Sequence, residues 1–429
     1  MTTDVRLRHG RASLGLSFFA QGAAFALLVT RIPAIQDRYG ISDGLLPVFL
    51  AAVPVLAGLS SVGTEQLVKR VRPSAVLRWA QPVVLLALLG AAAGTQLWQA
   101  AVSLGVFGLA VGALDASMNM LGVSLQRAYG RSIMLGFHAA YSLGGIAGAS
   151  LAWAGAHWHL SLLTSYWPVV VIALPACLVA SRWYADAREA DGAAAGTDGG
   201  AGALAGAEVV AEAGGVGEAG GAGGSVVFRM LLPLCLVMAF AYIGDSTVSN
   251  WSAKYLQDVL GSSEQLSTVP YNVYMVTTLL GRAVGDFGVR RFGAVAVVRF
   301  GSVVAALGFG VVAAATGPWV GMLGFTLLGF GLCVIVPQTF AAAGRLFPQA
   351  SDAAIARLNI FNYVGFLVGS PLVGAIGDAW NYRGAMLIPM VLVLATLGYA
   401  RSFGHGDARY GVRHERPRTV DVGRSSNEV

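Results

Sequence analysis

Asp115, Asn119 and His138 lie inside long apolar runs, in the stretch from Gly108 to Gly148. An ionisable side chain within hydrocarbon costs about 2.5 kcal/mol or more, so it usually faces a cavity or a partner. Asp115 and Asn119 are four residues apart and share one face of a predicted helix. Burial in an apolar medium favours the neutral form of a carboxyl group, which can then exchange a proton near neutral pH. The spacing therefore predicts proton carriage at Asp115, and a permanent ion pair or a hydrogen bond to Asn119 or His138 is the alternative.

Two further ionisable residues are candidates for proton coupling. His138 lies near one end of its predicted helix, where it could relay protons, although such a residue can also be a packing side chain. Asp245 lies in the seventh apolar run, with Ser249 on the same face. It could bind substrate, carry a second proton, or pair with an arginine.

Polar and aromatic side chains recur in the apolar runs, whereas the sixth, ninth and twelfth runs are almost purely apolar. Amide groups facing lipid would be left without hydrogen-bond partners, so we expect them to line a central path. The predicted substrate contacts are Gln21, Asn119, Tyr141, Asp245, Gln338, Asn359 and Asn362.

The composition is that of a membrane protein. Of the 429 residues, 56% are hydrophobic and 12% are charged, whereas ordinary soluble domains carry about 25% charged residues. The net charge of +6 is therefore not a nucleic-acid signal. The three cysteines lie in apolar runs without metal-ligand spacing, and no nucleophile–base pair or phosphate loop is present, so we expect no enzyme, no cofactor and no metal.

Twelve apolar runs are long enough to span a bilayer. They cover about 13–34, 45–68, 76–95, 101–126, 135–156, 162–183, 229–251, 266–288, 295–316, 319–345, 354–377 and 383–403. We expect an all-α membrane protein with a six-helix bundle at 1–185, a flexible Gly/Ala-rich linker at 186–226, a second bundle at 227–404, and a disordered tail at 405–429.

The two sets of six runs are copies of each other. Arg78 aligns with Arg299, an offset of 299 − 78 = 221, and the same offset pairs Gly144 with Gly365. An even number of spans in each half makes the copies parallel, related by an axis along the membrane normal.

Lys and Arg residues indicate the orientation in the membrane. With a cytoplasmic N-terminus, all 28 except Arg31, Arg38, Lys254 and Arg383 fall on the inner side. We expect both termini in the cytoplasm of a bacterial cell, with the chain in the inner membrane as a monomer. A cleaved leader is the alternative for the first run, but that run continues to Thr30, long enough to span.

The six-plus-six pattern, with a basic loop after the second and eighth spans, resembles the major facilitator superfamily over residues 13–403. The resemblance implies gating contacts at these loops. In this chain Lys69 and Arg290 stand where the family pattern has an acid, and Glu65 and Asp286 lie one helical turn earlier. The gating residues expected from the resemblance are Glu65, Arg70, Asp286 and Arg291.

The segment from Asp115 to Asn119 resembles the fourth helix of the fucose–proton symporter branch of that family, in which an acid four residues before Asn carries the proton. The sugar symporters also have an acid in the first helix, where this chain has Gln21. The resemblance thus implies proton coupling but not a sugar substrate.

We therefore expect a secondary transporter that moves a small organic solute by alternating access, with uptake coupled to protons. A proton-driven efflux antiporter is the first alternative, although the Gly-Pro motif usual in such exporters is absent from Ser142–Gly148. A membrane sensor or scaffold that does not transport is the alternative of another class.

Overall fold

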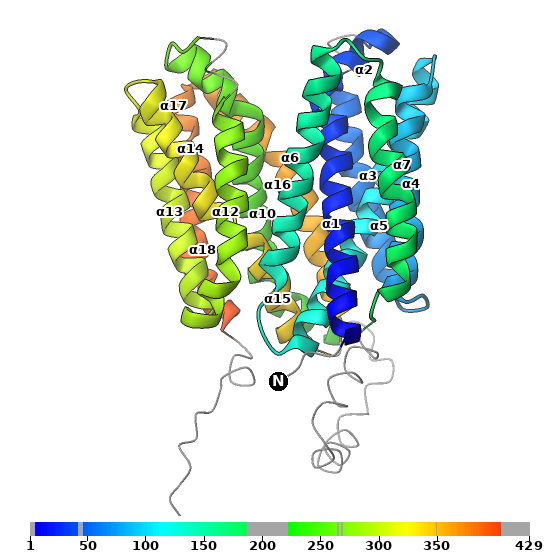
Figure 1. Cartoon of the computed structure of the whole chain (residues 1–429). Coiled ribbons are helices and arrows are strands. Elements are labelled where there is room, and N and C mark those ends of the chain that lie inside the picture. Colours follow the sequence, from blue (N-terminus) through cyan, green and yellow to red (C-terminus); the bar gives the residue numbers. More distant parts are fainter. Residues whose placement is uncertain are drawn as a thin grey trace, which may run out of the picture.

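The computed structural model describes residues 5–41, 46–186, 222–263, 266, 269–348 and 350–404, and every regular element in these ranges is a helix. Long helices run side by side in two groups, and the N-terminus lies at one end of them (Figure 1). The predicted all-α fold is confirmed. Most of the predicted linker and the whole predicted tail lie outside the described residues.

The N-terminal half contains seven helices, one of them short. They are α1 (Val5–Thr30), α2 (Ile32–Tyr39), α3 (Leu46–Leu67), α4 (Pro73–Ala93), α5 (Leu97–Tyr129), α6 (Met134–His157) and α7 (Leu162–Ala180), followed by a 3-10 turn at Ser181–Trp183. Asp186, which the sequence assigned to the linker, is buried and accepts hydrogen bonds from the backbone N–H and the hydroxyl of Ser74 at the start of α4.

The C-terminal half repeats this order. It contains α10 (Ala222–Lys254), a π-helical turn (Tyr255–Val259), α12 (Val269–Phe292), α13 (Ala294–Ala314), α14 (Pro318–Leu332), α15 (Ile335–Leu346), α16 (Ser351–Ala379), α17 (Tyr382–Ala385), α18 (Leu387–Tyr399) and a final 3-10 turn (Ala400–Phe403). Helix α10 begins at residue 222, inside the predicted linker. The helix is therefore longer than the apolar run from which its span was predicted.

The first and tenth predicted spans are divided in the structure near a proline. The first run ends at Thr30, and Pro33 stands in the first turn of the separate helix α2, where its fixed φ suits a helix start. The tenth run breaks between α14 and α15, just before Pro337, which cannot donate a backbone hydrogen bond in a helix interior. Pro371, in contrast, lies within the continuous helix α16.

Nine helical segments of the described chain are long and apolar enough to cross a membrane. Helices α3, α6 and α12 run beside them over a comparable length (Figure 1). Helix α12 is less apolar because it carries Arg282, Asp286, Arg290 and Arg291. The chain is a multi-pass membrane protein, and its helix count agrees with the twelve predicted spans.

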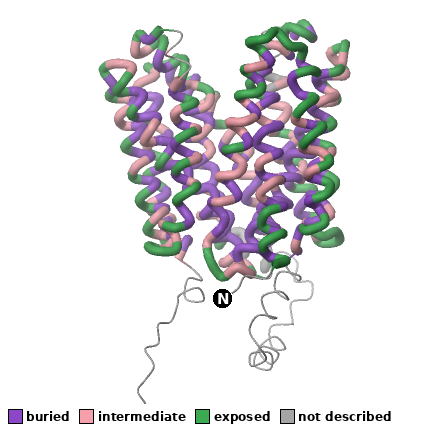
Figure 2. The backbone as a smooth tube through the Cα atoms, in the orientation of Figure 1, coloured by how far each residue is buried: buried purple, intermediate pink, exposed green. Residues whose placement is uncertain are grey.

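Each half is held together by close helix packing. A side chain at Gly144 or Gly148 would overlap the carbonyl groups of Phe19 and Ala23, so these glycines bring α6 against the backbone of α1. The equivalent Gly365 brings α16 against α10. Buried residues follow the helix interfaces within each half and between the halves (Figure 2).

Candidate functional site

The two halves meet mainly at the end where the N-terminus lies, which we call the closed end. They diverge toward the other end, which we call the open end (Figure 1). Four helices form the principal contacts between the halves, with α3 against α16 and α6 against α12. The cross-half hydrogen bonds described below involve residues in the parts of these helices nearer the closed end.

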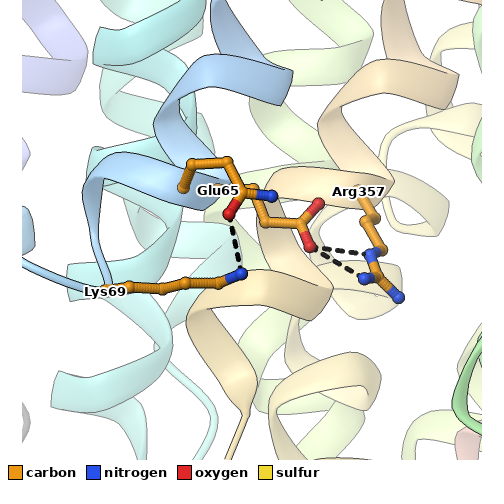
Figure 3. Close-up of polar contacts among 4 residues, drawn as sticks. Glu65, Lys69 and Arg357 are labelled. Carbon is orange, nitrogen blue, oxygen red and sulfur yellow. Dashed lines mark hydrogen bonds and ion pairs between the residues drawn. The ribbon is translucent and has the colours of Figure 1, made fainter. Parts of the chain in front are cut away.

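The first contact joins α3 to α16 through an ion pair. Two guanidinium nitrogens of Arg357 contact Oε1 of Glu65, at 3.0 and 2.8 Å (Figure 3). Lys69, drawn beside this pair, lies in the turn after α3 and instead donates to the side chain of Gln66 at the end of that helix, at 2.7 Å. One turn nearer the open end, Asn359 donates to the hydroxyl of Ser61, at 3.0 Å.

The second contact joins α12 to the start of α6. The carboxylate of Asp286 accepts hydrogen bonds from the hydroxyl of Ser132 at 2.6 Å and from the backbone N–H groups of Leu135 at 3.3 Å and Gly136 at 2.9 Å. A carboxylate at a helix N-terminus satisfies free N–H groups and complements the helix dipole. Arg282, one turn nearer the open end, donates to the hydroxyl of Ser142 at 2.6 Å.

These two contacts are copies of one another under the internal repeat. Glu65 and Asp286 are equivalent, since 286 − 65 = 221, and so are Ser61 and Arg282, since 282 − 61 = 221. Their partners are also equivalent. Arg357 corresponds to Gly136 (357 − 136 = 221) and Asn359 to His138 (359 − 138 = 221), whose backbone carbonyl accepts from Arg282 at 3.5 Å. The closed end therefore contains two contacts that are nearly related by two-fold symmetry and are built from different side chains.

Asp115 lies just beyond these cross-half contacts, on the side nearer the open end. Its half-buried carboxylate accepts a hydrogen bond from Gln21 of α1 on one oxygen and from Tyr363 of α16 on the other. Gln21 belongs to the same half as Asp115, whereas Tyr363 belongs to the opposite half. Asp115 has no ion pair with a basic side chain among the described residues. Its carboxylate thus joins the two halves through hydrogen bonds from uncharged donors.

Three predicted polar residues are buried with atoms that have no hydrogen-bond partner among the described residues. Asn119 donates to the backbone carbonyl of Asp115 at 2.9 Å, while its own Oδ1 has no hydrogen-bond partner within the described chain. The amide of Gln338 and Nε2 of His138 are likewise without protein partners. Buried polar groups generally require a partner, so these atoms are suited to water or solute.

The ring of His138 is held by two aromatic side chains. Its centroid lies 5.4 Å from that of Phe18 in its own half and 6.3 Å from that of Phe340 in the opposite half. The ring is therefore part of the packing between the halves, while its Nε2 has no hydrogen-bond partner among the residues that the structure describes.

Asp245 occupies a second polar centre, on α10. Its carboxylate accepts a hydrogen bond from Tyr274 of α12. Tyr141, on α6 of the other half, interacts electrostatically with both Asp115 and Asp245, and so does Tyr242. The structure thus places the two predicted carboxylates around one cluster of tyrosines that includes both halves.

The remaining predicted residues occupy different surroundings. Asn362 donates to Oδ1 of Asn359 at 3.2 Å, so it supports the first closed-end contact. Arg70 is exposed in the turn after α3, and Arg291 is exposed over the ring of Phe292, 5.6 Å from its centroid. Neither of these arginines takes part in the two cross-half contacts described above.

Arg282, Arg357 and Tyr363 make contacts in the site but are not among the residues predicted from the sequence. Arg282 and Arg357 are cations within spans, and that placement alone would have justified including them. Tyr363 gave no such signal, because a tyrosine in an apolar run is ordinary. Its importance comes from its position opposite Asp115 across the interface.

Comparisons with known proteins agree with this architecture. The family model of the Major Facilitator Superfamily matches residues 234–408. An uncharacterized MFS-type transporter of Yersinia pestis is 28% identical over 401 residues, which are 91% of this chain and 95% of that protein. The chain is thus similar to the Major Facilitator Superfamily over residues 234–408 and to an MFS-type transporter over most of its length. These similarities point to a membrane transporter rather than an enzyme.

Solved structures of this superfamily share the fold at low sequence identity. The E. coli fucose:proton symporter FucP has a TM-score of 0.72 and 17% identity, covering 91% of this chain and 98% of that chain. The proton:xylose symporter XylE has a TM-score of 0.76 and 13% identity, covering 96% of this chain and all of that chain. At such identities the likeness extends to the fold alone.

Proposed function

We propose that this transporter couples uptake of a small organic solute to protons, with Asp115 as the proton-carrying residue. The observation that carries the proposal is the pair of hydrogen bonds to Asp115, one from Gln21 in its own half and one from Tyr363 in the other. A carboxylate with neutral donors and no cation can gain or lose a proton without breaking an ion pair. The symporters FucP and XylE, which share the fold, make proton coupling a reasonable starting point.

Protonation of Asp115 would change the bond that joins the halves. The ionised carboxylate accepts from both Gln21 and Tyr363. A proton on the oxygen facing Tyr363 removes the charge assistance of that bond. Hydrogen bonds to charged groups contribute about 1.5–3 kcal/mol. A hydrogen bond between neutral groups contributes about 0.5–1.5 kcal/mol, so losing the charge assistance costs about 1–1.5 kcal/mol. That loss would shift the balance between two conformations by roughly 5- to 13-fold, which is a useful coupling for a transporter.

The solute would bind among the tyrosines and amides around the two carboxylates. We propose contacts from Gln21, Asn119, Tyr141, Asp245 and Gln338, with Asn359 and Asn362 becoming available when the closed end opens. In this conformation Asn359 is engaged with Ser61 across the interface. We also propose that His138 and Asp245 share in proton coupling.

The sidedness of the cycle follows from the basic residues. With both termini in the cytoplasm, the closed end faces the cytoplasm and the structure is in an outward-facing state. Two rigid halves that rock about the midplane would then release the Glu65–Arg357 and Asp286–α6 contacts to expose the solute inward. A bacterial inner membrane and a monomeric state complete this proposal.

The test uses purified protein in two stages. A thermal-shift screen against metabolites at two pH values first identifies a ligand, and uptake of that ligand is then measured in proteoliposomes under an imposed pH gradient. In Asp115→Asn we expect binding to survive and the response to the gradient to disappear. An Asp115→Asn protein that still concentrates solute against its gradient would refute the assignment, and net export under the same gradient would favour the antiporter.

A further inference from the structure

A separate cavity lies at the closed end, away from the tyrosine cluster. Its volume is about 420 Å³. The first turns of α1, the end of α5 with its following loop, and the start of α6 surround it. The lining residues are Arg8, Arg11, Ala12, Gly15, Tyr129, Arg131, Gly136 and Phe137. None of the residues proposed above as solute or proton contacts lines this cavity, so the cavity requires its own explanation.

Three guanidinium groups converge on this cavity around a single phenol. Arg11 and Arg131 lie over the ring of Tyr129, at 5.8 and 5.7 Å from its centroid, and Arg8 also interacts electrostatically with it. The lining holds no acidic side chain within the described chain. Asp286 lies beside Arg11 at Gly136, but its carboxylate already accepts three hydrogen bonds at the start of α6. Three cations with this one carboxylate next to the lining still repel one another, so the arrangement favours a bound anion.

The shape and chemistry of the lining favour a phosphate group. Guanidinium groups bind phosphate oxygens through paired, charge-assisted hydrogen bonds. Ala12, Gly15 and Phe137 add an apolar wall beside the basic rim, and a side chain at Gly15 would meet only open space. The cavity also lies at the ends of membrane-spanning helices, where basic side chains meet lipid headgroups.

We propose that this cavity binds a phosphate group at the closed end of the transporter, with Arg8, Arg11 and Arg131 as its ligands. An anionic phospholipid headgroup and a free phosphate ion present the same chemistry to these side chains. The basic rim with an apolar wall suits the headgroup of an anionic phospholipid, and the experiment separates it from the free ion.

The site adjoins one of the two cross-half contacts. A side chain built on Gly136 would lie 3.6 Å from a terminal nitrogen of Arg11 and 3.5 Å from Oδ2 of Asp286. Arg11 therefore flanks the same turn of α6 that Asp286 caps. A bound phosphate would draw Arg11 toward the cavity, next to the contact that holds the closed end together.

The test measures binding to the full-length protein without any transported solute. Thermal stability and bound-lipid counts by native mass spectrometry are compared in phosphatidylglycerol and phosphatidylcholine, and separately with inorganic phosphate. The variants are Arg8→Gln, Arg11→Gln and Arg131→Gln, singly and together. The matched control is Arg299→Gln, an exposed arginine near the start of α13 at the same end and outside the cavity.

Each basic side chain near a lipid surface contributes about 1 kcal/mol, so each single variant should weaken phosphatidylglycerol binding about five-fold. The triple glutamine variant should lose the preference over phosphatidylcholine, Arg299→Gln should keep it, and a triple lysine variant, which keeps the charge, should retain part of it. The same pattern with inorganic phosphate alone would support the site and identify the free ion as its ligand. Equal binding by the wild type and the triple glutamine variant, or no preference for either phosphate source, would overturn the proposal.

Discussion

The ion pair between Glu65 and Arg357 offers a direct test of how the closed end is held. Arg357 contacts one carboxylate oxygen of Glu65 through two nitrogens, at 3.0 and 2.8 Å. The Glu65 side chain is 9% exposed and that of Arg357 is 33% exposed. Full burial would give such charged bonds about 1.5–3 kcal/mol, and solvent at Arg357 reduces that, so we assign the contact about 1–2 kcal/mol. Removing it should shift the populations of closed and open conformations about 5- to 30-fold.

The assay is a distance measurement across the closed end. Spin labels on cysteines introduced at Val71 and Phe292, both exposed and in opposite halves, report whether the ends separate. The native cysteines are buried and need not be removed. Arg357→Gln should populate longer distances, Arg357→Lys should do so less, and Lys69→Gln, which breaks only a bond within its own half, should leave the distribution unchanged. Identical distributions for Arg357→Gln and the wild type would refute the assigned role.

Three further outcomes follow from the same contacts. Asp286→Asn should open the closed end by a similar factor, since it removes the charge that caps α6, and a wild-type label distance in this variant would contradict the equivalence of the two contacts. Tyr363→Phe should weaken the response of uptake to a pH gradient while leaving the melting temperature nearly unchanged; an unaltered response would show that its bond to Asp115 is not part of coupling. Gly144→Ala should lower the melting temperature, because the added methyl group overlaps the Phe19 carbonyl, and a melting temperature equal to that of the wild type would show that the two helices separate without cost.

Much of the architecture could be predicted because bilayer physics leaves few choices. Apolar run length determined the spans, and the offset of 221 residues predicted two equivalent halves. The same offset relates Glu65 to Asp286, and the structure shows both at cross-half contacts. Helix breaks were harder to place, since the division at Arg31 depends on local backbone geometry rather than on hydropathy.

The composition of the site could be predicted only in part. A carboxylate in an apolar run is costly and usually has a function, so Asp115 could be predicted as a site residue from the sequence. The partners of Asp115 could not be predicted in the same way, because they are distant in the sequence. Gln21 lies 94 positions away in the same half, and Tyr363 lies 248 positions away in the other half. Contacts across the interface depend on how the halves dock, and a linear pattern of residues carries no direct record of docking.

The most direct test of the central claim is to count protons as solute binds. Purified protein is mixed with an identified ligand in weakly buffered solution, and a pH-sensitive dye records uptake or release. We expect the wild type to exchange protons with the medium on binding, and Asp115→Asn to bind the same ligand without exchange. Equal proton exchange by the two proteins would contradict the assignment of coupling to this carboxylate.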